Sequence, residues 1–513
     1  MRRSAAALLI TRGSGEGVEV FLAERSRQLR FFGGYWALPG GTIDSDDGDG
    51  TEAAAMQACG RRELFEETGL LWQRLRRAHD RNELATLRRT MVERDAPRDG
   101  KRGGHGSPVG WRELERELDG APLRELCRIE TPPFVPVRYD TVFFHVPLEH
   151  CSAGSGEHAE PEVWPGELTQ GRFWRPADAL AAWRRGEIYI VPPILILLEH
   201  VAAAADADAL AAALAETAAS YRAGRLHEVR FSPGIVLAPL RTPTLPPATT
   251  TNCYVVGHEQ LFVVDPGSPH AEEQQRLNRL LDELEARGAR TAGILLTHHH
   301  PDHVGGVTAL SRARGLPVHA HPLTLSRTPV GFLVGDELED GSEIALGRAP
   351  DDGAADGSAW HLTAIHTPGH DRGHLCFRES RYGTALVGDM LSTMSTIIID
   401  PPEGHLASYL ASLDRLAERP ITTLYPAHGP AVRDGERLIA QYVRHRRQRE
   451  TALVKALEQG GGTLDELLPK VYWDADPKLY GFAARSLLAG LEKLAEEGRA
   501  VLDGERWRAH RSA

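Results

Sequence analysis

The sequence predicts a multidomain α/β protein. Its 513 residues exceed what a single hydrophobic core accommodates, so we expect several domains. Over most of the chain, short strands rich in β-branched residues alternate with helices, which is the pattern of α/β layers. From about residue 441 the pattern changes to three amphipathic helices and a short hairpin, which predicts a small separate module.

The chain divides into four predicted segments. A long Ala-rich helix ends at Gly224, and the proline-rich stretch FSPGIVLAPLRTPTLPPATT follows it, which marks the main boundary. Strands and helices on both sides of this boundary predict two α/β domains. We therefore expect an α/β domain over 1–205, a helical linker over 206–230, a second α/β domain over 231–440 and the helical module over 441–513.

The bulk composition indicates a cytoplasmic protein. The five cysteines are scattered and form no CxxC pair, as expected in a reducing compartment. No apolar run reaches the length of a membrane span, so we expect no membrane partner. The net charge of -12 argues against a broad nucleic-acid coat but does not exclude a local nucleic-acid site.

The strongest chemical signal is the stretch ILLTHHHPDHVGG. His298 and His300 follow an apolar strand and lie two residues apart, on the same side of an extended backbone. Pro301 then turns the chain, and Asp302 and His303 follow at a predicted helix start. Imidazole and carboxylate groups at this spacing can hold two adjacent metal ions, with zinc as the default from the ligand types.

Three further ligand candidates stand at the ends of later strands or turns. His370 follows a Pro-Gly turn, Asp389 ends an apolar strand, and His428 precedes a glycine at another strand end. His299 alternates with its neighbours and is expected to point away, and His374 is expected behind the ligands. The alternative is a set of surface histidines, since the chain has 23, but the clustered spacing argues against it.

Residues 235–430 resemble the metallo-β-lactamase superfamily at TTTNCYVVG, VVDPG, HHHPDH, TPGH, GD and AHG. The resemblance implies an αββα sandwich with a two-metal hydrolytic site at one edge. It implies one metal on His298, His300 and His370, a second on Asp302, His303 and His428, and Asp389 bridging them. Asp302 would also steer the proton of the attacking water. Zinc is expected, with iron and manganese as alternatives.

The sequence motifs do not identify the substrate of this site. The superfamily hydrolyses lactams, thioesters, lactones and phosphodiesters, so the fold alone does not determine the substrate class. The helical module resembles a winged helix, and HRRQRE at 445–450 resembles a branch of single-stranded RNA endonucleases. A thioesterase of the glyoxalase II type is the main alternative. The module would then pack on the catalytic domain or build a homodimer.

A second candidate site lies in ACGRRELFEETGL, from Ala58 to Leu70. On a helix, Glu63, Glu66 and Glu67 share one face, where their like charges repel unless a cation lies among them. With the upstream FFGGYWALPGGTID, the stretch resembles the box of Nudix hydrolases, which implies an α/β/α domain. It implies Mg²⁺ or Mn²⁺ on Glu66 and Glu67, with Glu63 sharing the metal or acting as base. The substrate would be a small diphosphate, of nucleoside diphosphate or coenzyme A type.

The first half of this box is irregular. Ala54 stands where the pattern has glutamate, and the nearest carboxylate is Glu52, behind the insertion DSDDGDGTE. Glu52 is the candidate partner for Arg62, and Glu167 is a candidate extra ligand. The alternative is an inactive Nudix-like domain that senses a ligand and regulates the hydrolase.

Overall fold

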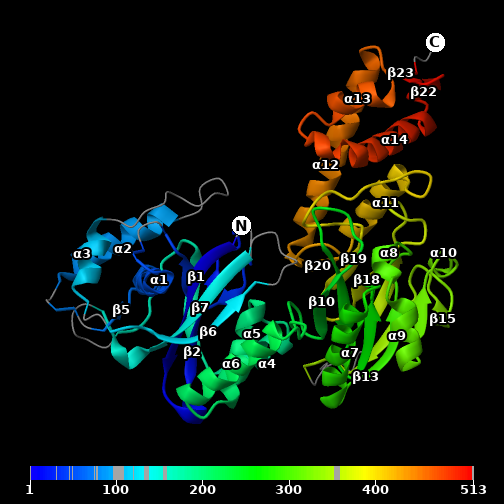
Figure 1. Ribbon diagram of the computed structural model, residues 1–513. Helices are drawn as coiled ribbons and strands as arrows, with labels where there is room; N and C mark the ends of the chain where they lie inside the picture. The colour runs from blue at the N-terminus through cyan, green and yellow to red at the C-terminus, as the bar shows by residue number, and fades with distance from the viewer. Residues whose placement is uncertain are drawn as a thin grey trace. The chain divides into compact units, whose positions relative to one another are not determined.

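The computed structural model describes residues 2–29, 32–44, 47–48, 50–73, 75–76, 79–95, 109–118, 121–131, 138–153, 159–351 and 359–510 (Figure 1). The contacts divide the chain into two compact units, residues 1–233 and 234–513. The limits predicted at residues 205, 230 and 440 stay predictions.

In the described part of the first unit, seven strands form a central sheet. Their order is β3-β2-β1-β7-β6, with β4 paired to β1 and β9 paired to β2. β1 runs parallel to β7 and antiparallel to β2. The strands are β1 (Arg2–Arg12), β2 (Glu19–Arg25), β3 (Trp36–Ala37), β4 (Gly40–Thr42), β6 (Arg124–Glu130), β7 (Arg138–Pro147) and β9 (Leu168–Trp174), and a separate ribbon pairs β5 (Leu71–Trp72) with β8 (Cys151–Ser152).

Helices cover both faces of this sheet, because its central strand is apolar on both sides. Successive side chains of a strand point to opposite faces. Leu8 therefore packs in one core with α1, and Leu9 packs in another with the later helices. The first face carries α1 (Glu52–Thr68), and α2 (Arg81–Asp95) and α3 (Val109–Arg116) pack with Phe65 of α1 in a separate small core. The second face carries α4 (Pro176–Arg184), α5 (Pro192–Ala203) and α6 (Ala207–Arg222).

Helix α1 has a capping residue at each end. Thr51 caps its first turn by accepting a hydrogen bond from the Ala54 N–H at 3.3 Å. Gly69 ends it with a φ of +73°, the left-handed conformation that glycine adopts at least cost. Helix α6, predicted as part of a linker, buries Leu210 and Leu214 in the second core of this unit.

The described residues of the second unit form two six-stranded sheets with helices outside them (Figure 1). The first sheet has the order β10-β11-β12-β13-β14-β15, and the second has the order β16-β17-β18-β19-β20-β21. The first contains β10 (Ile235–Arg241), β11 (Thr250–Val256), β12 (Gln260–Val264), β13 (Arg290–Leu295), β14 (Pro317–Ala320) and β15 (Leu333–Glu337). The second contains β16 (Glu343–Gly347), β17 (Trp360–His366), β18 (Leu375–Glu379), β19 (Thr384–Gly388), β20 (Thr423–Pro426) and β21 (Val432–Arg433).

The helices of this sandwich lie on its outer faces. α7 (Ala271–Ala286) and α9 (Val307–Arg314) contact the first sheet, and α11 (Leu406–Ala417) shares a core with the second. Two single-turn helices, α8 (Pro301–Val304) and α10 (Pro322–Leu325), follow β13 and β14. Within the part of the chain that the structure describes, no helix is both long and apolar enough to cross a membrane.

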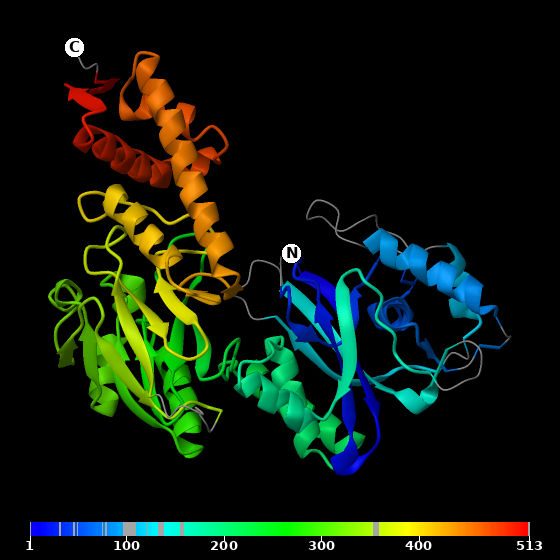
Figure 2. The same cartoon turned by 180° about the vertical axis from the view of Figure 1, so that it is seen from behind.

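Residues 435–510, all of them described, form three helices and a terminal hairpin. The α-helices are α12 (Gly435–Glu458), α13 (Leu464–Val471) and α14 (Tyr480–Glu496), a single 3-10 turn (Pro477–Leu479) precedes α14, and the hairpin pairs β22 (Ala500–Asp503) with β23 (Arg506–Ala509). The predicted helices and hairpin are confirmed. Helix α12 takes part in two cores: Ile439 packs with the second sheet and α11, and Leu453 packs with α13 and α14. Figure 2 shows this orange helix running from the sandwich into the terminal module.

A buried carboxylate ties together three strands of the second sheet. Glu379, at the end of β18, is 0% exposed. Its oxygens accept hydrogen bonds from the Trp360 indole N–H at 3.0 Å and from the backbone N–H groups of Arg381, Tyr382 and Thr384 at 2.8, 2.7 and 2.9 Å. Glu379 thus satisfies the turn between β18 and β19.

Replacing Glu379 by alanine leaves these buried donors without an acceptor. We expect the free energy of unfolding to fall by at least about 3 kcal/mol, because each unsatisfied buried group costs about 1–3 kcal/mol. Urea denaturation followed by circular dichroism measures the change. Glu343→Ala is the control, since that side chain is 66% exposed, and it should change stability by less than about 0.5 kcal/mol. Equal effects of the two substitutions would contradict this role.

Candidate functional site

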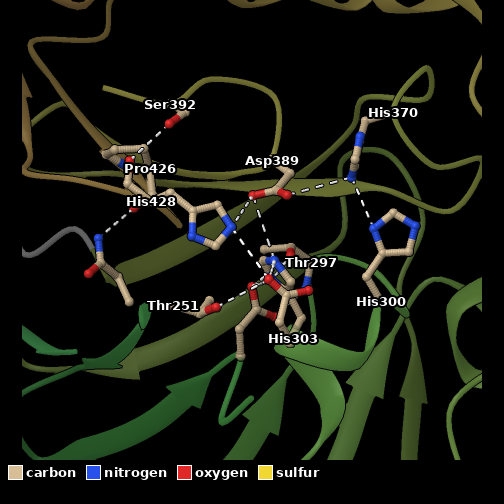
Figure 3. Close-up of polar contacts among 12 residues, drawn as sticks. Thr251, Thr297, His300, His303, His370, Asp389, Ser392, Pro426 and His428 are labelled. Carbon is tan, nitrogen blue, oxygen red and sulfur yellow. Dashed lines mark hydrogen bonds and ion pairs between the residues drawn. The ribbon is translucent and has the colours of Figure 1, made fainter. Parts of the chain in front are cut away.

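The predicted ligands of the second unit gather at one edge of the sandwich, because each follows a strand that ends there. β13 leads to His298 and His300, α8 carries Asp302 and His303, and the other three follow β17, β19 and β20. Figure 3 shows His300, His303, His370, Asp389 and His428 turned toward one another. The structure thus brings together every residue predicted for this site: His298, His300, Asp302, His303, His370, Asp389 and His428.

Three imidazoles form the first ligand group. His298 Nε2 lies 2.9 Å from His300 Nδ1, which lies 3.0 Å from His370 Nε2. Burial, together with the neighbouring imidazoles, lowers the pKa of His298 well below its usual value and that of His300 to about 3. Both rings are therefore neutral at physiological pH and offer lone pairs, which is the form that binds metal.

The second group joins a carboxylate to two imidazoles. Asp302 Oδ2 lies 3.5 Å from His428 Nε2 and 3.9 Å from His303 Nε2. Asp389 lies between the groups: its Oδ1 is 3.6 Å from His303 Nε2 and 3.4 Å from His428 Nε2, while its Oδ2 is 3.6 Å from His370 Nε2. Its two oxygens therefore face different groups, as the predicted bridging role requires.

Two buried atoms at the centre test whether a metal fits. His303 Nε2 and Asp389 Oδ1 have no hydrogen-bond partner within the described part of the chain. Buried polar atoms almost always have a partner, so such a pair calls for an explanation. The surrounding donors are imidazole nitrogens and carboxylate oxygens, the ligands that zinc and similar cations take. These residues fit a pair of divalent cations.

Backbone carbonyls set the tautomers of two ligands. His370 Nδ1 lies 2.9 Å from the Ile398 carbonyl oxygen, and His428 Nδ1 lies 3.2 Å from that of Thr250. A carbonyl oxygen can only accept, so Nδ1 of each ring carries the proton. The lone pair of Nε2 is consequently turned to the centre, as second partners of metal-binding histidines generally ensure.

Asp265 orients His303 in the same way, a role that the sequence motifs did not predict. Its Oδ2 lies 2.8 Å from His303 Nδ1 and accepts from the Thr297 hydroxyl at 2.6 Å, and its Oδ1 accepts from the Thr297 N–H at 2.8 Å. The backbone of Asp265 has a φ of +51°, an uncommon conformation for a residue other than glycine. The available signal was its place in VVDPG at a strand end.

The remaining histidines of these motifs lie behind the ligands. His299 Nδ1 is 2.6 Å from Asp371 Oδ2, an ion pair that the sequence did not predict. His374 is buried; its Nδ1 lies 2.9 Å from the Thr367 hydroxyl, and its Nε2 accepts from the Asp389 N–H at 3.2 Å. Burial lowers the pKa of His374 to about 3, so the ring is neutral and holds the backbone of Asp389.

In the first unit, the predicted glutamates of α1 line one pocket. Glu63, Glu66 and Glu67 share it with Glu167, and its other walls are Val92, Trp164 and Leu168. The Gly40 N–H donates to Glu67 Oε2 at 2.6 Å, and a Cβ on Gly41 would lie 2.0 Å from Glu63 Oε1. The glycines of the predicted box therefore let the backbone approach the carboxylates closely.

The charge in this pocket favours a cation. Burial raises the pKa of Glu67 well above its usual value, and the carboxylates of Glu63 and Glu167 raise it further. A hard cation such as Mg²⁺ would relieve that repulsion and takes carboxylate ligands. The residues of this pocket fit such an ion.

The partner of Arg62 is Asp47, and the suggestion of Glu52 is wrong. Arg62 is 2% exposed and places Nε and Nη2 each 2.8 Å from the two oxygens of Asp47. Its Nη1 lies 2.9 Å from Glu63 Oε1. Glu52 instead forms a surface ion pair with Arg128 at 2.6 Å. Asp47 thus belongs to the insertion and reaches Arg62 of α1. Three other residues of the insertion, Ser45, Asp46 and Asp49, lie outside the residues that the structure describes.

Arg88 supports the same pocket from α2 and was not predicted. It donates to the carbonyls of Glu66 and Glu67 at 3.0 and 3.1 Å, which satisfies the last turn of α1. Its guanidinium carbon lies 4.3 Å from the centre of the Trp164 ring. Burial lowers the pKa of Arg88 to about 10, so the side chain stays charged at physiological pH.

Three stretches of the chain match family models. Residues 246–428 match the metallo-beta-lactamase superfamily, residues 463–507 match the beta-lactamase associated winged helix domain, and residues 1–100 match the NUDIX domain. The resemblances inferred from the sequence motifs are thus confirmed, together with the multidomain α/β fold.

Several known proteins are similar to part of the chain. Lactamase-like protein adaB of Aspergillus niger is 28% identical over 274 residues, which cover 50% of this chain and 78% of that protein. The atrochrysone carboxyl ACP thioesterase of Passalora fulva is 29% identical over 262 residues, or 48% and 72% of the two chains. The hydroxyacylglutathione hydrolase of Aeromonas salmonicida (strain A449) is 35% identical over 190 residues, or 36% and 63%.

Asp47→Ala tests the buried pairing in the first unit. It leaves the Arg62 guanidinium buried without its bidentate partner, so we expect the free energy of unfolding to fall by about 3 kcal/mol. Glu52→Ala is the matched control, because its ion pair is exposed and should contribute less than about 1 kcal/mol. Chemical denaturation of both variants measures the difference. A larger loss in Glu52→Ala would restore the pairing suggested by the sequence.

Proposed function

Because the chain joins a NUDIX domain to a metallo-β-lactamase-fold hydrolase with a C-terminal winged helix, we propose that its His–Asp centre binds two zinc ions and hydrolyses acyl thioesters. The metal assignment depends on two buried atoms, His303 Nε2 and Asp389 Oδ1, which have no hydrogen-bond partner among the described residues. The other candidate ligands converge on them. Two similar proteins bear the names ACP thioesterase and hydroxyacylglutathione hydrolase, which supports an acyl substrate.

Each residue of the centre has a defined part in this proposal. His298, His300 and His370 would hold one cation, Asp302, His303 and His428 the other, and Asp389 both. When bound, such cations supply a water of lowered pKa and a Lewis acid for the scissile carbonyl.

Asp302 has a second part beside that of ligand. Its Oδ2 accepts a hydrogen bond from the Thr251 hydroxyl at 3.3 Å, which fixes the direction of the carboxylate. We assign Asp302 to steer the proton of the attacking water as well as to hold a cation.

Single-stranded RNA is the less favoured substrate. The motif at 445–450 suggested it, but two of its arginines make internal contacts. Arg446 donates to the Ile397 carbonyl, and Arg449 donates to the Val471 carbonyl at 2.8 Å and pairs with Asp474 at 2.7 Å. Side chains engaged in this way add little to an electrostatic surface for phosphates.

Asp302→Ala and His300→Ala test the centre. We expect each purified variant to stay folded and to lose hydrolysis of acyl-coenzyme A and hydroxyacylglutathione, because a ligand of one cation is gone. His258→Ala, an exposed histidine outside the site, is the control and should keep wild-type rates. Steady-state kinetics with metal analysis measures the effect. Full activity in either ligand variant would refute the assignment, and cleavage of single-stranded RNA alone would refute the thioester substrate.

We propose that the first unit binds Mg²⁺ or Mn²⁺ on Glu66 and Glu67 and hydrolyses a small diphosphate of nucleoside or coenzyme A type. Glu63 would share the metal or act as base towards water. The crowded pocket with Glu167 supports this, as does the paired Arg62, which offsets the irregular first half of the box. The alternative is a ligand sensor that regulates the thioesterase.

Glu66→Gln separates these alternatives. An enzyme should show Mg²⁺-dependent release of phosphate-containing products that falls to background in the variant, because the amide is a poorer ligand than the carboxylate. Glu83→Gln, on the exposed side of α2, should behave as wild type. Chromatographic assay of coenzyme A and nucleoside diphosphate derivatives measures turnover, and calorimetry measures binding. Saturable binding without turnover in the wild type would favour the sensor.

A further inference from the structure

A short stretch of backbone, residues 397–399, lies between the metal centre and the C-terminal helices; we call it the 397–399 strap. The carbonyl of its middle residue, Ile398, accepts the hydrogen bond from His370 Nδ1 at 2.9 Å. That bond sets the tautomer of His370 and the direction of its Nε2 lone pair. The position of the strap therefore controls one of the predicted metal ligands.

Two side chains of the C-terminal helices hold the strap on either side of that carbonyl. Arg446, on α12, donates an Nη2–H to the carbonyl of Ile397. Ser486, on α14, accepts the N–H of Ile399 on its hydroxyl oxygen at 3.2 Å. The Ile399 N–H belongs to the same planar peptide group as the Ile398 carbonyl. Arg446 and Ser486 therefore hold the peptide groups on both sides of the Ile398 Cα, which leaves this carbonyl little freedom to turn.

Arg446 is enclosed where it makes this contact. It is 6% exposed, and its guanidinium carbon lies 5.2 Å from the centre of the Tyr409 ring. Tyr409 is itself buried and donates its hydroxyl to the Met390 carbonyl at 2.7 Å, next to Asp389. Burying an arginine costs free energy unless its contacts compensate. The hydrogen bond to the Ile397 carbonyl and the contact with the Tyr409 ring are two such compensating contacts.

Neighbouring contacts keep the same region in place. The Tyr442 hydroxyl on α12 donates to the Ser395 carbonyl at 2.7 Å, just before the strap. Arg485 on α14 pairs with Asp400 at 2.8 Å, just after it. Helices α12 and α14 therefore hold the strap and the residues on either side of it. Arg447, next to Arg446, instead lines a groove between α11, α12 and α14.

We infer that the C-terminal helices are a working part of the metal centre, with Arg446 and Ser486 as positioning residues. They act on His370 through the 397–399 strap and keep its Nε2 aimed at the cation that His298 and His300 share. This inference rests on the proposed metal binding but not on the identity of the substrate. It also gives Arg446 of the motif at 445–450 a role that requires no nucleic acid.

Arg446→Met and Ser486→Ala, made in the full-length chain, test this inference. Methionine replaces the stem of the arginine side chain with an apolar one of similar bulk and removes the guanidinium, and with it the donor to the strap. We expect Arg446→Met to weaken zinc affinity about 10-fold, because loss of a partner behind a metal ligand typically costs about 10–100-fold. Ser486→Ala, which removes one hydrogen bond, should weaken it several-fold. Arg447→Met is the matched control and should bind zinc as the wild type does.

Zinc affinity is measured by competition with a chromogenic chelator, and thermal unfolding of the metal-free proteins is recorded beside it. Lower unfolding temperatures with wild-type zinc affinity in both variants would reduce the two residues to structural ones and overturn the inference. If Arg446→Met does not fold, Ser486→Ala decides alone. If the wild type binds zinc but does not hydrolyse thioesters, the proposed substrate is wrong and this inference still stands. If the wild type binds no zinc, both the proposed metal centre and this inference are wrong.

Discussion

The carboxylate of Asp389 is the constraint on which the second unit depends. It is buried at the edge where two sheets meet, with one oxygen facing His303 and His428 and the other facing His370. An anion in that position is costly unless positive charge accompanies it. The backbone carbonyls and the Asp265 carboxylate behind the imidazoles orient the lone pairs inward, which is the arrangement that a cation needs from its ligands.

The sandwich supplies this geometry by ending its strands at the same edge. β13, β17, β19 and β20 each deliver a ligand in the loop that follows them. Distant residues orient three of the ligands: Asp265 contacts His303, Ile398 contacts His370, and Thr250 contacts His428. The Asp265 carboxylate accepts hydrogen bonds from both the backbone N–H and the hydroxyl of Thr297. The C-terminal helices hold the 397–399 strap in the same way, so the terminal module belongs to the support of the site as well as to the packing of the fold.

In the first unit, the guanidinium of Arg62 offsets part of the negative charge around α1. Arg62 shares its guanidinium between Asp47 and Glu63, and this leaves the face of α1 beside Glu67 and Glu167 with excess negative charge. Burial raises the pKa of Glu67, and the neighbouring carboxylates of Glu63 and Glu167 raise it further. The arginine thus stabilises one side of the helix, while the carboxylates on the other side face the pocket that we propose as a metal site.

The sequence by itself determined the chemical class of both sites. The spacing from His298 to His303 and the three glutamates of α1 are local patterns, and local backbone geometry is enough to bring such donors together. Only the tertiary structure decided that Asp47 and not Glu52 pairs with Arg62, that Asp265 orients His303, and that Arg446 turns inward to the strap. These contacts join segments distant in the chain, and packing decides such pairings because burial favours whichever partner the fold places within hydrogen-bond distance.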